Sequence, residues 1–146
     1  MTESAKISEL TDRDRAVLAE MEAWVAGHYT EETRHIYEHF TCKLEMLQEI
    51  LDNNSIEESD PHRELLWQRL GATLGTTLTQ YYDRLAWKII DDEFGRSFCL
   101  VYKDTTIRIF PIPMISKRLM AGEAVSIRRI FVATCEAIDK GRNEAV

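Results

Sequence analysis

Apolar residues recur at helical spacing over three stretches of the first half of the chain. The first begins at Thr11, with Asp12 and Asp14 where carboxylates favour a helix N-terminus. The second runs from Thr33 to Leu51, and the third follows Pro61. The apolar stripe of the third stretch comprises Leu66, Leu70, Leu74, Leu78, Tyr81 and Leu85. The pattern predicts an N-terminal helical hairpin followed by a long third helix.

The period changes to that of strands at Trp87. Three short apolar segments, residues 87–91, 97–102 and 106–110, are separated by turn-favouring residues, which predicts a three-stranded antiparallel meander. Pro111 ends the last strand because proline cannot donate to the ladder. A short helix closed by Gly122 and a last helix capped by Ser126 are expected to follow.

The order of three helices, three strands and two helices indicates the α+β class, because the strands are grouped rather than alternating with helices. Residues 1–146 are interpreted as a single α+β domain in which the helical hairpin and the long third helix pack on the meander. Gly71 and Gly75 lie one turn apart in the third helix. We expect their missing side chains to admit a close neighbour within the fold rather than a second copy.

Composition narrows the class of protein. The chain has 18 Lys and Arg against 25 Asp and Glu, a net charge of −7, which does not favour nucleic-acid binding. No apolar run approaches the roughly 20 residues of a membrane-spanning helix, and no signal peptide is predicted. The cysteines Cys42, Cys99 and Cys135 lack paired spacing, which predicts a reduced, cytoplasmic protein whose thiols pack as small apolar groups.

Charge is divided unevenly along the chain. Residues 1–75 contain 7 Lys and Arg and 16 Asp and Glu, whereas residues 76–146 contain 11 and 9. In the second half, only Asp104 and Glu123 accompany a run of cations: Arg96, Lys103, Arg108, Lys117, Arg118, Arg128 and Arg129. We expect these cations to pair with the acidic helices of the first half, and the alternative is a basic surface.

His35, Glu38 and His39 form an H-x-x-E-H pattern, in which two histidines one turn apart hold zinc and the glutamate activates water. The chain has no recognisable motif for a third ligand, and both histidines fall on the outward side of the predicted helix. Solvated histidines are therefore the favoured interpretation, and no metal or other cofactor is predicted.

A second candidate site lies at the strand ends. Asp91 and Asp92 end the first predicted strand, and Arg108, Lys117 and Arg118 supply cations suited to a carboxylate or phosphate ligand. The simpler interpretation is that the aspartates form a hairpin turn and the cations pair with them inside the protein. No nucleophile elbow or glycine-rich phosphate loop accompanies these residues.

Three segments carry a family resemblance. Residues 70–75 (LGATLG), 87–95 (WKIIDDEFG) and 110–118 (FPIPMISKR), with Gly122-Glu123 after them, resemble the small bacterial proteins grouped as domain of unknown function 3806. The resemblance covers about residues 65–120 and implies a compact bacterial α+β domain without an assigned catalytic site. It leaves out the N-terminal helical hairpin, where the specificity of this protein is expected to lie.

These observations favour a non-enzymatic protein-interaction module, in its most concrete form an immunity or adaptor protein that binds and blocks an unidentified partner protein. The predicted contact is the acidic loop that contains Glu57, Glu58 and Asp60. The alternative is a small anionic-ligand binder or enzyme that uses the strand-end site. The sequence leaves a homodimer open.

Overall fold

The computed structural model describes residues 5–28, 39–53 and 62–144. In chain order its elements are β1 (Lys6–Ser8), α1 (Asp12–Ala26), α3 (Phe40–Asn53), α4 (Arg63–Tyr81), β2 (Leu85–Asp92), β3 (Gly95–Tyr102), β4 (Arg108–Ile109), α5 (Met114–Met120) and α6 (Ile127–Glu144). The predicted α+β class is confirmed.

The sheet is antiparallel, and its strands follow the order β1-β2-β3-β4. The meander of β2, β3 and β4 agrees with the prediction. Strand β1 is an additional edge strand, with Ile7 opposite Ile90 of β2. Its three residues are too few to show an alternating pattern, so the sequence does not reveal this strand. The predicted sheet of three strands therefore has a fourth.

The β2–β3 hairpin closes at Glu93 and Phe94. Asp92 lies opposite Gly95, and the Phe94 amide donates a hydrogen bond of 2.9 Å to Asp92 Oδ1. Gly95 has a φ of 110°, which a residue with a side chain rarely adopts. The prediction that residues 92–95 form a hairpin turn is confirmed.

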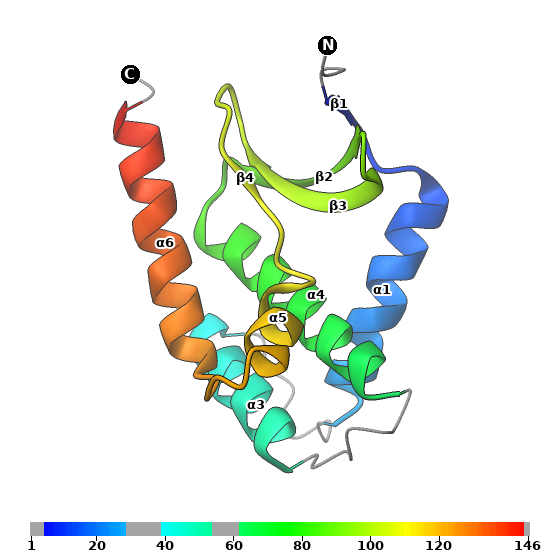
Figure 1. Cartoon of the computed structure of the whole chain (residues 1–146), viewed down its shortest axis with the longest axis vertical. Helices are drawn as coiled ribbons and strands as arrows, with labels where there is room; N and C mark the ends of the chain where they lie inside the picture. Colours follow the sequence, from blue (N-terminus) through cyan, green and yellow to red (C-terminus); the bar gives the residue numbers. More distant parts are fainter. Residues whose placement is uncertain (1–4, 29–38, 54–61, 145–146) are drawn as a thin grey trace.

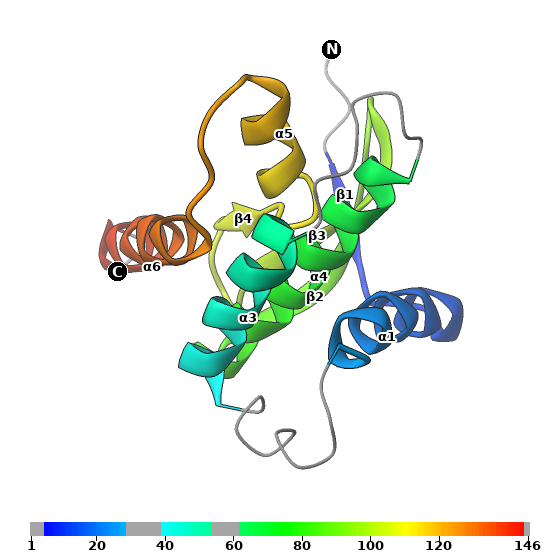
Figure 2. The same cartoon turned by 90° about the horizontal axis from the view of Figure 1, so that it is seen from below.

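Helix α4 lies at the centre of the fold. It runs beneath the sheet, and α1 and α6 stand on opposite sides of it (Figure 1, Figure 2). Leu70, Leu74 and Leu78 of this helix are fully buried in the hydrophobic core. The helix ends before Tyr82, whose backbone is extended (φ −118°, ψ 110°). Leu85 keeps helical spacing from the preceding stripe but lies in β2, so its prediction as a helical residue is wrong.

Two glycines let other segments approach α4 closely. A Cβ at Gly71 would lie 2.5 Å from the Ile112 carbonyl oxygen and 2.6 Å from that of Pro111, and a Cβ at Gly75 would overlap the Trp87 ring. The segment that joins β4 to α5 therefore crosses α4 at Gly71. Packing within the fold accounts for both glycines, as expected.

Helix α6 is held to the rest of the fold at both ends. Near its start, Gln48 of α3 accepts a hydrogen bond of 2.7 Å from the Ile127 amide and donates one of 3.1 Å to the Val125 carbonyl. The predicted Ser126 cap is confirmed by a 3.3 Å hydrogen bond from the Arg129 amide. Further along, the Tyr82 hydroxyl donates to Asp139 Oδ1 at 2.9 Å.

We expect Gln48→Ala to lower the free energy of unfolding by about 1–2 kcal/mol, because it removes both hydrogen bonds and leaves a helix-start amide without its partner. Glu49→Ala, at an exposed position of the same helix, is the matched control and is expected to stay within about 0.5 kcal/mol of the wild type. Urea unfolding monitored by circular dichroism measures both changes. Equal effects of the two substitutions would contradict the assigned role of Gln48.

Candidate binding grooves

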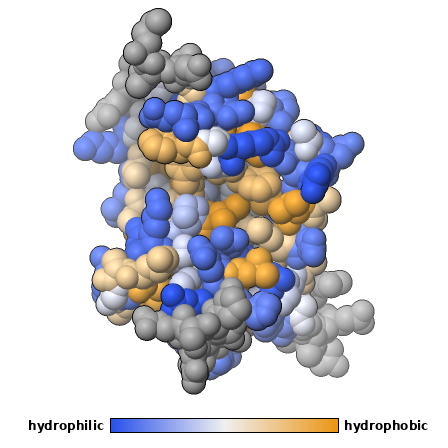
Figure 3. Space-filling view, turned by 45° about the vertical axis from the view of Figure 1, so that its right-hand side comes forward, coloured by the Kyte–Doolittle hydropathy of each residue, from blue (hydrophilic) through white to orange (hydrophobic). Residues whose placement is uncertain are grey.

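A groove with a volume of about 610 Å³ lies between the β2–β3 hairpin, α1 and the segment that joins β4 to α5. We call it the hairpin groove. It is lined by Met21, Gln68, Asp92, Phe94, Ser97, Phe98, Phe110, Ile112, Pro113 and Lys117. Apolar side chains form most of this lining, and Asp92 and Lys117 are its charged members. Figure 3 shows apolar residues gathered in the middle of one face of the molecule, with hydrophilic residues around them.

Phe94 is the most exposed large apolar side chain of the described residues. It stands at the tip of the hairpin and is 88% exposed. A turn of this kind is ordinarily made of polar residues and glycine, so the position does not require an aromatic ring. Phe110, on the other side of the groove, is 37% exposed. Exposed apolar side chains grouped around a groove are typical of a binding site.

Two structural contacts set the shape of the hairpin groove. The close crossing at Gly71 positions Pro111 and Ile112. It thereby fixes the side of the groove that is formed by the segment between β4 and α5. The opposite side is fixed by a bidentate pair of hydrogen bonds. The Arg96 guanidinium, in the hairpin, donates to the two oxygens of the Asp14 carboxylate in α1, at 2.8 Å and 2.6 Å. These hydrogen bonds therefore fix the position of the hairpin relative to α1.

Asp14 has a second role at the start of α1. Its carboxylate accepts a hydrogen bond of 2.8 Å from the Thr11 amide, and the Thr11 hydroxyl accepts one of 3.1 Å from the Asp14 amide. This reciprocal pair is a capping box. The hydrogen bonds from the Arg96 guanidinium and from the Thr11 amide hold the pKa of Asp14 well below its ordinary value, so the carboxylate is charged at neutral pH.

A second groove lies between α5 and α6. It consists of two adjoining hollows of about 420 Å³ and 550 Å³ that share Arg118 and Ala133. We call it the α5–α6 groove. Its charged lining residues are Arg108, Lys117, Arg118, Arg129 and Glu123. The groove is therefore lined by cations with a single carboxylate among them.

The structure divides the predicted strand-end site between these grooves. Arg108, Lys117 and Arg118 come together in the α5–α6 groove, while Asp92 shares the hairpin groove with Lys117. Asp91 lies on the hairpin opposite Arg96 and lines neither groove. The five residues therefore do not form one site.

The expected ion pairs between the strand-end cations and aspartates are not formed. Arg108 donates instead to the Thr106 carbonyl at 2.8 Å, and Arg118 donates to the Met114 carbonyl at 3.0 Å. Within residues 5–28, 39–53 and 62–144, no ion pair includes Arg108, Lys117 or Arg118. The interpretation that these three cations pair internally with the aspartates is wrong, because Arg108 and Arg118 bind carbonyl groups of their own segments and Lys117 forms no ion pair within the described residues.

Other cations of the second half do pair with the acidic first half, as the charge distribution predicted. Arg96 binds Asp14, and Arg128 approaches Glu45 at 3.8 Å. Lys88 also contacts Glu9. The prediction of internal pairing therefore holds for part of the basic run and not for the α5–α6 groove.

Several predicted residues lie outside the described part of the chain. These are the loop residues Glu57, Glu58 and Asp60 and the motif residues His35 and Glu38. His39 is described and is exposed. Among the described residues, no group of three His, Cys, Asp or Glu side chains is arranged to hold a metal ion. The contact through the acidic loop stays a prediction.

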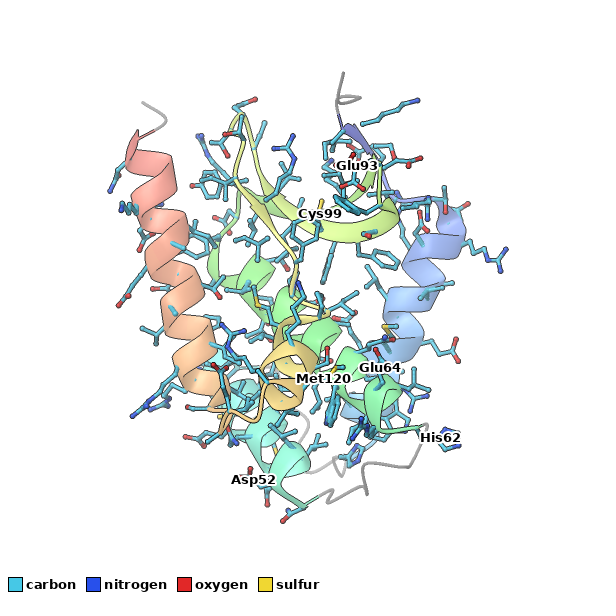
Figure 4. All side chains as sticks on the ribbon, viewed as in Figure 1. Asp52, His62, Glu64, Glu93, Cys99 and Met120 are labelled. Atoms are coloured by element: carbon cyan, nitrogen blue, oxygen red, sulfur yellow. The ribbon has the colours of Figure 1, made fainter. Side chains whose placement is uncertain are left out.

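The cysteines pack as expected from their apolar sequence neighbours. Cys99 is fully buried in the sheet (Figure 4), and Cys42 and Cys135 are half-buried. Burial raises the pKa of the Cys99 and Cys135 thiols above their ordinary value, which keeps these two thiols protonated at neutral pH. None of the helices in the described ranges is long and apolar enough to cross a bilayer.

Comparison with known proteins places this fold in a family. A family model described as Domain of unknown function (DUF3806) matches residues 43–131, and the chain belongs to this family. The match extends beyond the expected residues 65–120 and begins inside α3, so the expectation that the second predicted helix lies outside it is wrong. All residues that line the hairpin groove except Met21 fall within the match.

The fold is also found in a solved structure. A crystal structure of a protein from Bacteroides thetaiotaomicron VPI-5482 matches with a TM-score of 0.72 and 18% sequence identity, over 94% of this chain and 49% of the other. The chain thus spans about half the length of that protein. No curated protein matches the chain.

Proposed function

We propose that this protein is a non-enzymatic interaction module that binds a partner protein through the hairpin groove. The observation that carries the proposal is Phe94, an 88% exposed aromatic ring at the edge of an apolar groove. Aromatic side chains, Phe among them, are enriched in protein interfaces, where a few residues carry most of the binding energy. Phe94 is suited to be such an anchor.

The chemistry of the groove supports binding rather than catalysis. Its lining is mainly apolar, and one oxygen of Asp92 already accepts the Phe94 amide hydrogen bond. Lys117 then supplies a cation at the α5 side, which is suited to orient a partner carboxylate. An adaptor or immunity protein that covers a partner's surface is the concrete form of this proposal, and the unpaired cysteines suit a cytoplasmic location.

The proposal predicts that Phe94→Ser strongly weakens partner binding without loss of stability. The ring is almost fully exposed, so its removal leaves the core unchanged, whereas loss of an interface anchor weakens binding by about 30-fold or more. The measurement is recovery of tagged protein from its native host at native expression, with quantitative mass spectrometry of the copurifying proteins.

Val132→Ser is the matched control, because Val132 is 47% exposed on α6 and lines neither groove. We expect a stoichiometric partner with the wild type and with Val132→Ser, and its loss from Phe94→Ser. A partner that is retained equally by all three proteins would exclude the hairpin groove as the binding site.

A further inference from the structure

We infer that the α5–α6 groove binds an acidic segment of the partner polypeptide. This inference rests on the proposed function. It names the chemistry of the partner segment next to the one that occupies the hairpin groove. Its basis is the set of cations that line the α5–α6 groove and form no ion pair within the described residues, in contrast to Arg96 and Arg128 of the same basic run.

Two of the positive charges in the groove are oriented by the protein, and none of them forms an ion pair within the described residues. The guanidinium groups of Arg108 and Arg118 donate to backbone carbonyls, which fix their position and leave their net charge in place. In the described residues Lys117 and Arg129 also take part in no ion pair, although Arg128, next in sequence to Arg129, approaches Glu45. A ligand that carries carboxylates would replace water around these cations and form charge-assisted hydrogen bonds.

The shape of the groove favours an extended polypeptide over a small anion. Its two hollows meet at Arg118, so the cations are distributed along its length between Arg108 and Arg129 rather than gathered around one point. Between the cations most of the lining is apolar, and its accessible apolar members include Met114, Val125 and Ala133. Acidic side chains that alternate with apolar ones match this lining, whereas a nucleic-acid backbone would leave the apolar positions unused.

The two grooves adjoin each other. Phe110, Pro113 and Lys117 line both of them, so one partner segment can place an apolar side chain against Phe94 and its acidic residues between α5 and α6. The expected recognition element is therefore an apolar anchor followed by Asp or Glu residues.

Selection from a random dodecapeptide library on the immobilised full chain tests this partner chemistry directly. We expect the wild type to enrich peptides that combine Asp or Glu with an apolar residue. The double variant Arg108→Glu/Arg129→Glu is expected to lose this enrichment and to bind the best wild-type peptide about tenfold more weakly in fluorescence anisotropy. Affinity of the wild type is also expected to fall as the salt concentration rises.

The matched control is Arg13→Glu/Lys103→Glu, which changes the net charge equally at exposed positions outside both grooves. It is expected to bind the peptide like the wild type. The inference is overturned if no acidic peptide is enriched, if both double variants bind equally, or if a single-stranded oligonucleotide binds the wild type more tightly than the peptide does. Retained partner binding by Phe94→Ser would instead contradict the proposed function, so the two failures are distinguishable.

Discussion

Replacing Gly71 by alanine is expected to lower the free energy of unfolding by about 2–3 kcal/mol. The added Cβ would lie 2.5 Å from the Ile112 carbonyl oxygen and 2.8 Å from the Ile112 Cα. Both are backbone atoms, so relief requires the whole β4–α5 segment to move away from α4. This cost outweighs the roughly 1 kcal/mol that alanine gains over glycine in a helix.

The matched control is Gly27→Ala. Gly27 follows α1 with a φ of −64°, and an added Cβ there would meet carbonyl oxygens at 3.4 Å, the lower end of ordinary contact. We expect its free energy of unfolding to stay within about 1 kcal/mol of the wild type. Urea titration of both variants gives the comparison. A Gly71→Ala protein as stable as Gly27→Ala would show that the crossing of α4 is not as close as described.

Replacing Asp14 by asparagine is expected to produce the next largest loss of stability. The Asp14 side chain is only 8% exposed and accepts hydrogen bonds from both Arg96 and Thr11. Asparagine keeps the shape but removes the charge that binds the guanidinium, so the hairpin and α1 lose their link. The midpoint of thermal unfolding should fall further than for Thr11→Ala, which removes part of the cap alone and costs about 1 kcal/mol.

The same pair predicts a pH dependence. The pKa of Asp14 is lower in the folded protein than its ordinary value of 3.8, so the folded state favours the charged form. Its stabilising effect is fully present above pH 3.8 and is lost as the pH falls below this value toward the folded pKa. The difference in stability between wild type and Asp14→Asn should therefore narrow between pH 4 and pH 2. A constant difference over this range would contradict the assigned charge interaction.

The sequence predicts those parts of the fold that depend on local patterns. Helical spacing identifies α4, and the two glycines of α4 are interpreted correctly because a missing side chain has a direct steric consequence. The hairpin turn and the Ser126 cap depend on local turn and capping chemistry, which the sequence also shows. Strand β1 is too short to have a pattern of its own, and its pairing with β2 depends on residues more than 80 positions away.

The candidate sites depend on long-range contacts that a single sequence does not show. The hydrogen bonds between Asp14 and Arg96 join residues 82 positions apart, so neither residue indicates the other in the sequence. The sequence groups Asp91 and Arg108 in one strand-end cluster, yet the strand register separates them. Asp91 lies opposite Arg96 of β3, whereas Arg108 lies opposite Val101, further along the same strand. One local signal for the hairpin groove is present in the sequence: Phe94 stands in a turn whose other residues are polar or glycine.

The central claim, that Phe94 contacts a partner protein, is tested most directly by photocrosslinking. Phe94 is replaced by p-benzoylphenylalanine, which keeps an aromatic ring at the hairpin tip, and the native host is irradiated while it expresses the full chain. We predict a covalent adduct with one partner protein, with an acidic segment of that partner next to the crosslinked residue, and no adduct when the same substitution is made at Val132. The absence of an adduct at position 94, or the same adduct from both positions, would contradict the claim.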